Sequence, residues 1–124
     1  MELRPRAKLW IEANGRLVMS DYRMRLLDRV DSSGSLARAA EELGLSYRRA
    51  WGKLKELEAN LGFPLVKSEA GGPGGGHTTL TTQAQAFVHA YQEFSERVEA
   101  DVSATFDEVL RPAMSRGNRP HDHR

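Results

Sequence analysis

The 124-residue sequence contains no cysteine, so it offers neither disulfide bonds nor thiolate ligands for a metal. No apolar run approaches the roughly 18 residues that a membrane-spanning helix requires, and the first residues, MELRPRAKLW, lack the apolar segment of a signal peptide. No Ser/His/Asp set or acidic pair stands in a readable catalytic motif. These absences argue against a disulfide-stabilised protein, a membrane protein and an enzyme, and we expect a cytoplasmic protein.

Charge is distributed unevenly along the chain, although the net charge is only +1. Residues 1–67 carry 13 Lys and Arg against 9 Asp and Glu, whereas residues 68–124 carry 5 against 8. The first part would therefore attract a polyanion, although a solvated surface with uneven salt pairing explains the same numbers. With 40% hydrophobic and 28% charged residues, the composition is that of an ordinary globular domain.

Two short helices joined by a tight turn are predicted near the middle of the sequence. Ser35 is placed to cap a helix over residues 36–43, whose apolar residues recur with helical spacing. Gly44 is typical of a helix end, and Ser46 then caps a second helix over about residues 47–60. This is the layout of a helix-turn-helix.

A β-hairpin and a further helix are predicted before these two helices. The pair Asn14-Gly15 lies between two partly alternating apolar runs, which predicts a hairpin over residues 7–19 with a type I′ turn. Ser20 and Asp21 offer capping groups for a helix that follows, and its apolar spacing reaches Val30.

A glycine cluster follows the second helix of the pair, with five glycines in the six positions 71–76. A nucleotide phosphate loop would need a lysine after the last glycine and a helix directly behind it, and the sequence has neither. The cluster is then either a flexible linker or the tip of a wing, a hairpin with strands at residues 65–67 and 77–80. A wing tip approaches DNA closely because glycine leaves room for the backbone and its N–H donors.

Several motifs resemble the N-terminal DNA-binding domain of the molybdate-responsive ModE regulators, a family related to the LysR-type regulators. They are SYRRAW, the run LGFPLV, the cluster GGPGGG followed by LT, and the hairpin KLWIEANGRLVM. The resemblance covers roughly residues 7–90. It implies a mainly α-helical winged helix-turn-helix with small β content, in a bacterial transcription regulator that binds double-stranded DNA.

The resemblance also sets an expectation about sensing. Family members that sense molybdate carry C-terminal oxyanion-binding domains, whereas this chain ends about 14 residues after its last predicted helix. We therefore expect no direct molybdate binding and no cofactor. The expected organisation is a winged domain at residues 1–80, a long dimerisation helix at residues 81–111 and a disordered tail at residues 112–124.

The face of helix 47–60 opposite its apolar stripe is centred on Arg48, Gly52 and Lys55, at 100° per residue. Arginine near the start of such a helix grips guanine with two donors, so Arg48 and Arg49 are predicted to read base edges. Trp51 suits either packing at the edge of the core or contact with DNA. The other predicted DNA contacts are Ser46, Tyr47, Lys53, Lys55, Gly52, Lys67, Ser68, Gly72, Gly74, Gly75 and His77.

The long C-terminal helix predicts a homodimer. Its apolar residues recur at helical spacing, and those beyond residue 94 have no obvious partner within the chain. The same helix of a second copy, related by a two-fold axis, would cover them, and the alternative is a helix folded back on its own domain. The predicted interface residues are Phe94, Val98, Val102, Phe106 and Val109.

Other functions compete with DNA binding. Winged helices sometimes bind proteins instead, but the outward cations Arg48 and Lys55 favour DNA. A direct molybdate or tungstate sensor rests on family analogy alone. His121 and His123 are a weak metal site because structural and catalytic metals take three or four placed ligands, so no metal is expected.

Overall fold

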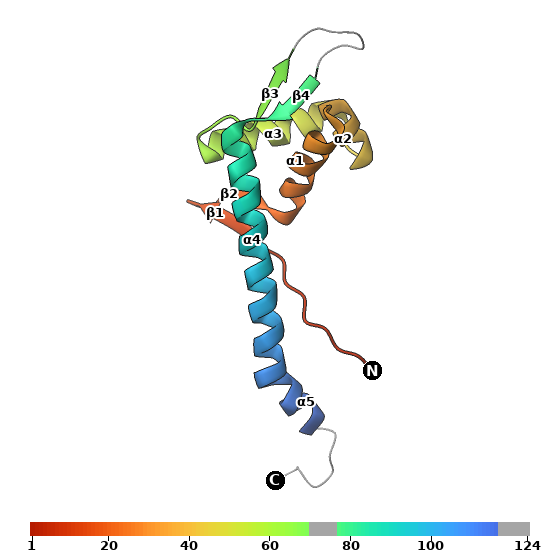
Figure 1. The fold of residues 1–124 in the computed structure, drawn as a ribbon, viewed down its shortest axis with the longest axis vertical. Coiled ribbons are helices and arrows are strands. Elements are labelled where there is room, and N and C mark those ends of the chain that lie inside the picture. Colours follow the sequence, from red (N-terminus) through yellow and green to blue (C-terminus); the bar gives the residue numbers. More distant parts are fainter. Residues whose placement is uncertain (70–76, 117–124) are drawn as a thin grey trace. The chain divides into compact units, whose positions relative to one another are not determined.

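The computed structural model describes residues 1–69 and 77–116 (Figure 1). The chain divides into two compact units, one of Leu9–Ala90 and one of Met1–Lys8 with the chain from Tyr91 onward. The sequence placed a boundary between residues 80 and 81, whereas this division falls within a helix. No helix among the described residues has the length and apolar character needed to cross a membrane.

The unit Leu9–Ala90 begins with the predicted hairpin. Strands β1 (Trp10–Ala13) and β2 (Arg16–Ser20) pair antiparallel, with a bulge between Ile11 and Glu12. Asn14 and Gly15 have φ angles of 54° and 76°, as a type I′ turn requires. The hairpin prediction is therefore confirmed.

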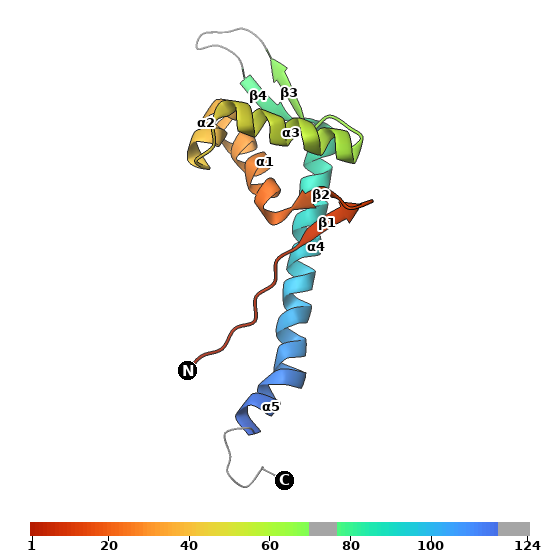
Figure 2. The ribbon, with the colours of Figure 1, turned by 180° about the vertical axis from the view of Figure 1, so that it is seen from behind.

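Three helices follow: α1 (Asp21–Ser33), α2 (Leu36–Glu42) and α3 (Tyr47–Leu61). Each begins after a serine whose hydroxyl accepts a hydrogen bond from a backbone N–H three residues later. The capping serines are Ser20, Ser35 and Ser46, so the predicted helix starts are confirmed. Figure 2 shows α3 on the near face of this unit, beside the second hairpin.

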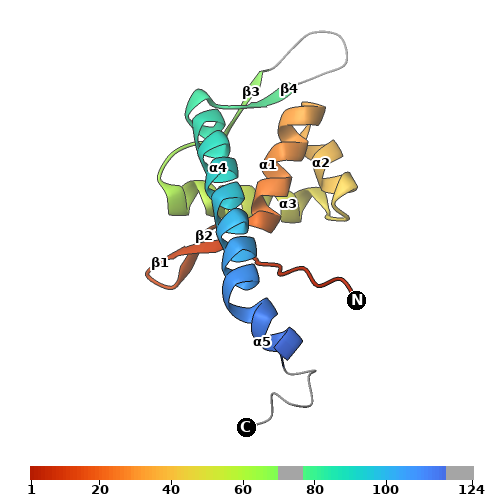
Figure 3. The ribbon, with the colours of Figure 1, turned by 60° about the horizontal axis from the view of Figure 1, so that its bottom comes forward.

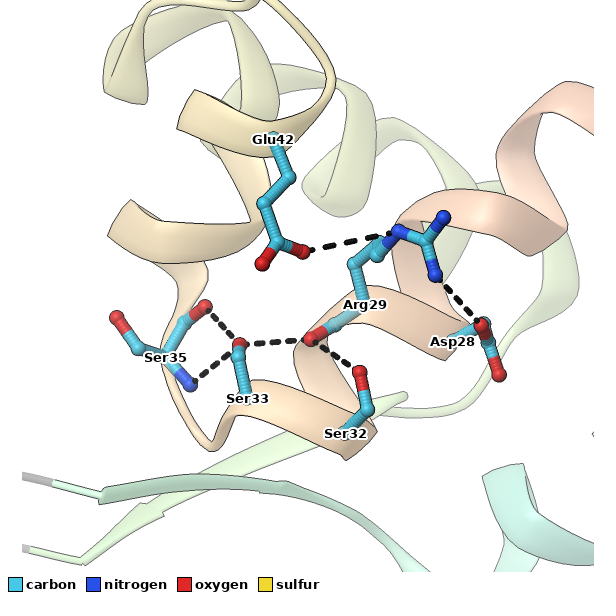
Figure 4. A network of polar contacts seen from close by, with 6 residues as sticks. All are labelled: Asp28, Arg29, Ser32, Ser33, Ser35 and Glu42. Carbon is cyan, nitrogen blue, oxygen red and sulfur yellow. Dashed lines mark hydrogen bonds and ion pairs between the residues drawn. The ribbon is translucent and has the colours of Figure 1, made fainter.

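Helix α1 extends beyond its predicted end near Val30, because two serines fit into its last turn (Figure 4). The Ser32 and Ser33 hydroxyls donate to the Arg29 carbonyl oxygen at 3.3 and 2.7 Å. Ser33 Oγ also accepts from the Ser35 N–H at 3.2 Å, which joins the end of α1 to the start of α2. Gly34, with φ 70°, ends the helix in the left-handed conformation.

The core of this unit lies between the three helices and the base of the second hairpin. Its fully buried large side chains come from β2, α1, α3 and the segment that follows α3. They are Met19, Leu26, Leu27, Val30, Leu54, Leu57 and Leu65. Ala39 and Ala40 are the small residues of α2 that allow it to pack closely on its neighbours.

The second hairpin consists of β3 (Val66–Glu69) and β4 (His77–Leu80), paired antiparallel from Val66 opposite Leu80 to Glu69 opposite His77. Strand β4 was predicted at these residues, and β3 lies slightly later than residues 65–67. The Thr78 N–H donates to the Gly34 carbonyl oxygen at 2.9 Å, so the hairpin is fastened to the end of α1. Residues 70–76, which include Gly72, Gly74 and Gly75, lie outside the described residues.

Helix α4 (Thr82–Thr105) is capped by Thr81, whose hydroxyl accepts from the Ala84 N–H at 3.0 Å. It leads into a π-helical turn, η1 (Phe106–Leu110), and then into α5 (Arg111–Arg116), as Figure 3 shows. The Arg111 N–H bonds to the Phe106 carbonyl oxygen, five residues back, which defines the π turn. The expectation of disorder from residue 112 is thus wrong for residues 112–116, and residues 117–124 lie outside the described part.

The two glycines that end α1 and α2 make a matched test of how the second hairpin is held. Gly34 and Gly44 both have φ 70°, but a Cβ on Gly34 would lie 2.3 Å from the His77 ring, whereas a Cβ on Gly44 would meet nothing within 4 Å. Gly44→Ala should cost about 1–2 kcal/mol for the left-handed conformation alone. Gly34→Ala should cost more, because His77 must also move.

Chemical denaturation of both variants measures this difference. Adding His77→Ala should restore part of the stability of Gly34→Ala and none of the stability of Gly44→Ala. Equal losses in the two single variants would show that His77 does not pack on Gly34 in solution.

Candidate nucleic-acid interface

Helix α3 presents the outward face that its sequence predicted. Ala50, Leu54 and Leu57 are at most 1% exposed and fix the inner side of the helix. Arg48, Gly52 and Lys55 are exposed on the opposite side. The Ser46 hydroxyl accepts from the Arg49 N–H at 3.2 Å, so the helix end that carries Arg48 and Arg49 is firmly formed.

Gly52 stands in open space on this face. A Cβ added there would meet no atom within 4 Å outside the local helix backbone. Glycine inside a helix costs about 1 kcal/mol relative to alanine. Packing within the described residues therefore gives no reason for glycine at this position, and close approach by another molecule gives one.

One flank of α3 faces the second hairpin and is held there by Glu58. Its side chain is only 13% exposed, and its Oε2 accepts from the Leu65 and Val66 N–H groups at 2.7 and 3.4 Å. Its Oε1 pairs with Lys55 Nζ at 3.1 Å. The carboxylate thus joins the outward helix directly to the start of the hairpin, and residue patterns alone did not single it out.

Lys55 and Trp51 lie together on this flank. Lys55 Nζ is 5.4 Å from the centroid of the Trp51 ring, a cation–π contact, as well as paired with Glu58. Trp51 is 48% exposed, so it is a surface residue rather than part of the core. A ligand that takes Lys55 must therefore compete with both of these contacts.

The other flank of α3 faces the first turn of α1 and gathers cations. Arg23 Nη2 lies 3.3 Å from Glu56 Oε1, and Lys53 Nζ lies 5.7 Å from the centroid of the Tyr22 ring. Burial lowers the pKa of Lys53, the Arg23 and Arg49 guanidinium groups lower that pKa further, and the Glu56 carboxylate raises it. The sequence predicted Lys53 and Arg49 as DNA contacts and did not single out Tyr22 and Arg23, because only the fold brings the first turn of α1 to α3.

The predicted DNA contacts of the second hairpin differ in their surroundings: two are exposed on β3, and one contacts the end of α1. Lys67 and Ser68 are exposed on β3, opposite Thr79 and Thr78. The His77 ring packs against Gly34 at the start of β4, although the residue as a whole is exposed. Tyr47, at the start of α3, is 56% exposed. Within residues 1–69 and 77–116, no group of three or more His, Asp or Glu side chains is placed to hold a metal ion.

Comparison with known proteins assigns this arrangement to a family. Residues 22–85, which run from α1 into α4, match the bacterial regulatory helix-turn-helix proteins of the LysR family. The chain belongs to the LysR family. The match includes all three helices of the domain and the second hairpin.

Curated relatives of this LysR-family chain carry the ModE name. The transcriptional regulator ModE of Haemophilus influenzae is 32% identical over 108 residues, which are 82% of this chain and 42% of ModE. The DNA-binding transcriptional dual regulator ModE of Escherichia coli K12 is 31% identical over 107 residues, 86% of this chain and 41% of ModE. The resemblance to ModE is confirmed, and the chain spans about two fifths of the length of these relatives.

Two solved structures confirm the winged helix-turn-helix fold. The crystal structure of the CbnR DBD–DNA complex has a TM-score of 0.53 and 24% identity, covering 67% of this chain and 90% of that one. The BenM DBD/benA site 1 DNA complex has a TM-score of 0.53 and 21% identity, covering 73% of this chain and 96% of that one.

The role of Glu58 is tested by two substitutions of different severity. Glu58→Ala leaves two backbone N–H groups without their acceptor, which should cost about 1–3 kcal/mol of unfolding free energy. Glu58→Gln keeps one carbonyl oxygen for these donors and should lose clearly less. Amide hydrogen exchange of Leu65 and Val66, followed together with chemical denaturation, should show faster exchange in the alanine variant. Unchanged exchange there would contradict the proposed hydrogen bonds.

Proposed function

We propose that the chain acts as a sequence-specific DNA-binding transcription regulator, with α3 in the major groove and the β3–β4 hairpin on the backbone or in the minor groove. One observation carries this proposal: the exposed face of α3 combines Arg48 with a glycine at position 52 that packing does not require. Arginine supplies the paired donors that read guanine, and a missing side chain lets the helix backbone come close to the bases.

The surroundings of this face support the same function. Cations flank it on the α1 side, and Lys67 is exposed on β3. Contacts to phosphates on both sides would fix the register of α3 without reading sequence. The named relatives are transcriptional regulators, and the two structural neighbours were crystallised with DNA. We extend these properties to this chain as part of the proposal.

A homodimer completes the proposed regulator. In the unit that contains the end of α4, Phe94, Val109 and Leu110 are 46%, 63% and 50% exposed, and Met114 of α5 is also exposed. Val98, Val102 and Phe106 are only half-buried. Burying such side chains contributes about 1.5–3 kcal/mol each, so a second copy of the helix is a favourable partner. Two-fold symmetry would also present two α3 helices to two half-sites.

The variant Gly52→Ala tests the proposed function because its two effects should have opposite signs. Stability should rise by about 1 kcal/mol, since alanine favours the helix and nothing stands within 4 Å of its Cβ. Affinity for DNA fragments that the wild-type protein selects from genomic DNA should fall, because the methyl group enters the groove contact. Thermal unfolding and gel shifts measure the two effects. A variant that gains stability and binds these fragments as wild type does would contradict this docking of α3.

The dimer is tested by a double variant with a matched control. Val102→Glu/Phe106→Glu places two charges on the apolar face and should yield a monomer that binds DNA far more weakly. Ala100→Glu/Ala104→Glu adds the same charge at exposed positions on the other side of α4 and should remain dimeric. Light scattering at tens of micromolar protein measures the oligomeric state of each variant. A monomeric wild-type protein at this concentration would overturn the dimer proposal.

A further inference from the structure

A cluster of cations lies where the first turn of α1 meets α3, and we call it the α1–α3 cluster: Tyr22, Arg23, Arg49 and Lys53. Two contacts join the helices here: Arg23 pairs with Glu56 at 3.3 Å, and Lys53 Nζ lies 5.7 Å from the centroid of the Tyr22 ring. Arg49 stands one helical turn before Lys53 on α3 and is exposed. Arg49 and Lys53 therefore share the side of α3 that meets Tyr22 and Arg23 of α1.

The charged groups that act on Lys53 are mostly positive. Arg23 and Arg49 lower its pKa, and the Glu56 carboxylate, which raises it, is already paired with Arg23. Among the described residues, the Arg23 Nε has no hydrogen-bond partner, although that atom is buried. That buried atom is out of reach of a ligand, but the neighbouring cations repel one another, and an anion beside Arg49 and Lys53 would relieve this repulsion.

We propose that the α1–α3 cluster binds a phosphate of the DNA backbone, on the flank of α3 opposite the hairpin. This inference rests on the proposed function and adds two contributors from α1, Tyr22 and Arg23. Lys53 and Arg49 supply charge, and the exposed Tyr22 supplies a hydroxyl donor beside them. Since Glu58 holds the hairpin on the other flank, α3 would be gripped from both sides of the groove.

The titration of Lys53 supports this assignment. Its pKa is lowered by burial and by Arg23 and Arg49, with Glu56 opposing them, and the Tyr22 ring covers one side of the ammonium group. A bound phosphate would favour the charged form and raise the pKa of Lys53 again. A structural lysine away from DNA would show no such change.

The experiment measures binding of a fluorescein-labelled 30-base-pair duplex of arbitrary sequence by fluorescence anisotropy between 50 and 200 mM salt. Lys53→Met should lower the slope of log affinity against log salt by about 0.9 per bound chain, and the affinity at 100 mM salt by roughly 5–10-fold. Lys53→Arg should restore both. Arg25→Met removes an equal charge from an exposed position of α1 and should leave the slope unchanged.

The outcomes separate this site from the proposed function. If the wild-type protein binds no DNA, the proposed function fails and the phosphate site fails with it. If the wild-type protein binds with a steep salt slope and Lys53→Met matches Arg25→Met, the function stands and the α1–α3 cluster is not a phosphate site. Thermal unfolding checks that each variant is folded.

A second measurement uses the unmutated chain. NMR titration of reductively methylated lysines should show the pKa of Lys53 rising when the duplex is added. A pKa that stays the same in the complex would overturn the proposal even if Lys53→Met weakens binding.

Discussion

The burial of one face of α3 is the constraint on which the rest of the domain depends. Ala50, Leu54 and Leu57 are almost fully buried, so the helix has no freedom to rotate about its own axis. Every outward property of α3 follows from this fixed orientation. Arg48 and Gly52 face outward because the apolar residues face inward, and the two flanks of the helix meet different neighbours.

The contacts and charge of each flank of α3 depend on the element that packs beside it. On the hairpin side, the Glu58 carboxylate of α3 accepts hydrogen bonds from two backbone N–H groups at the start of the hairpin. At the start of β4, the Gly34 carbonyl oxygen accepts from the Thr78 N–H, and Gly34 leaves room for the His77 ring. The hairpin is thus fastened at both strands, to α3 on one side and to the end of α1 on the other. On the α1 side, Arg23 pairs with Glu56, and Arg23 and Arg49 both lower the pKa of Lys53.

Electrostatics on the two flanks differ for a physical reason. Lys55 is paired with Glu58 and lies over the Trp51 ring, so its positive charge is compensated within the protein. Burial lowers the pKa of Lys53, and the Arg23 and Arg49 guanidinium groups lower it further. The same helix therefore carries one lysine that is paired, Lys55, and one whose charged form is disfavoured, Lys53. The two residues look alike in the sequence and differ only in their neighbours in the fold.

The sequence by itself determined the local structure: the capping serines and the Asn14-Gly15 turn follow from contacts within a few residues, and strand β4 and the outward face of α3 follow from the spacing of apolar and polar residues. It misjudged the ends of helices, because Ser32 and Ser33 stabilise the last turn of α1 and because η1 and α5 continue the chain past Leu110. Only the tertiary structure decided which side chains meet across elements. Glu58 with Leu65, His77 with Gly34 and Arg23 with Glu56 are distant or unremarkable in sequence, and each depends on how helices and strands pack.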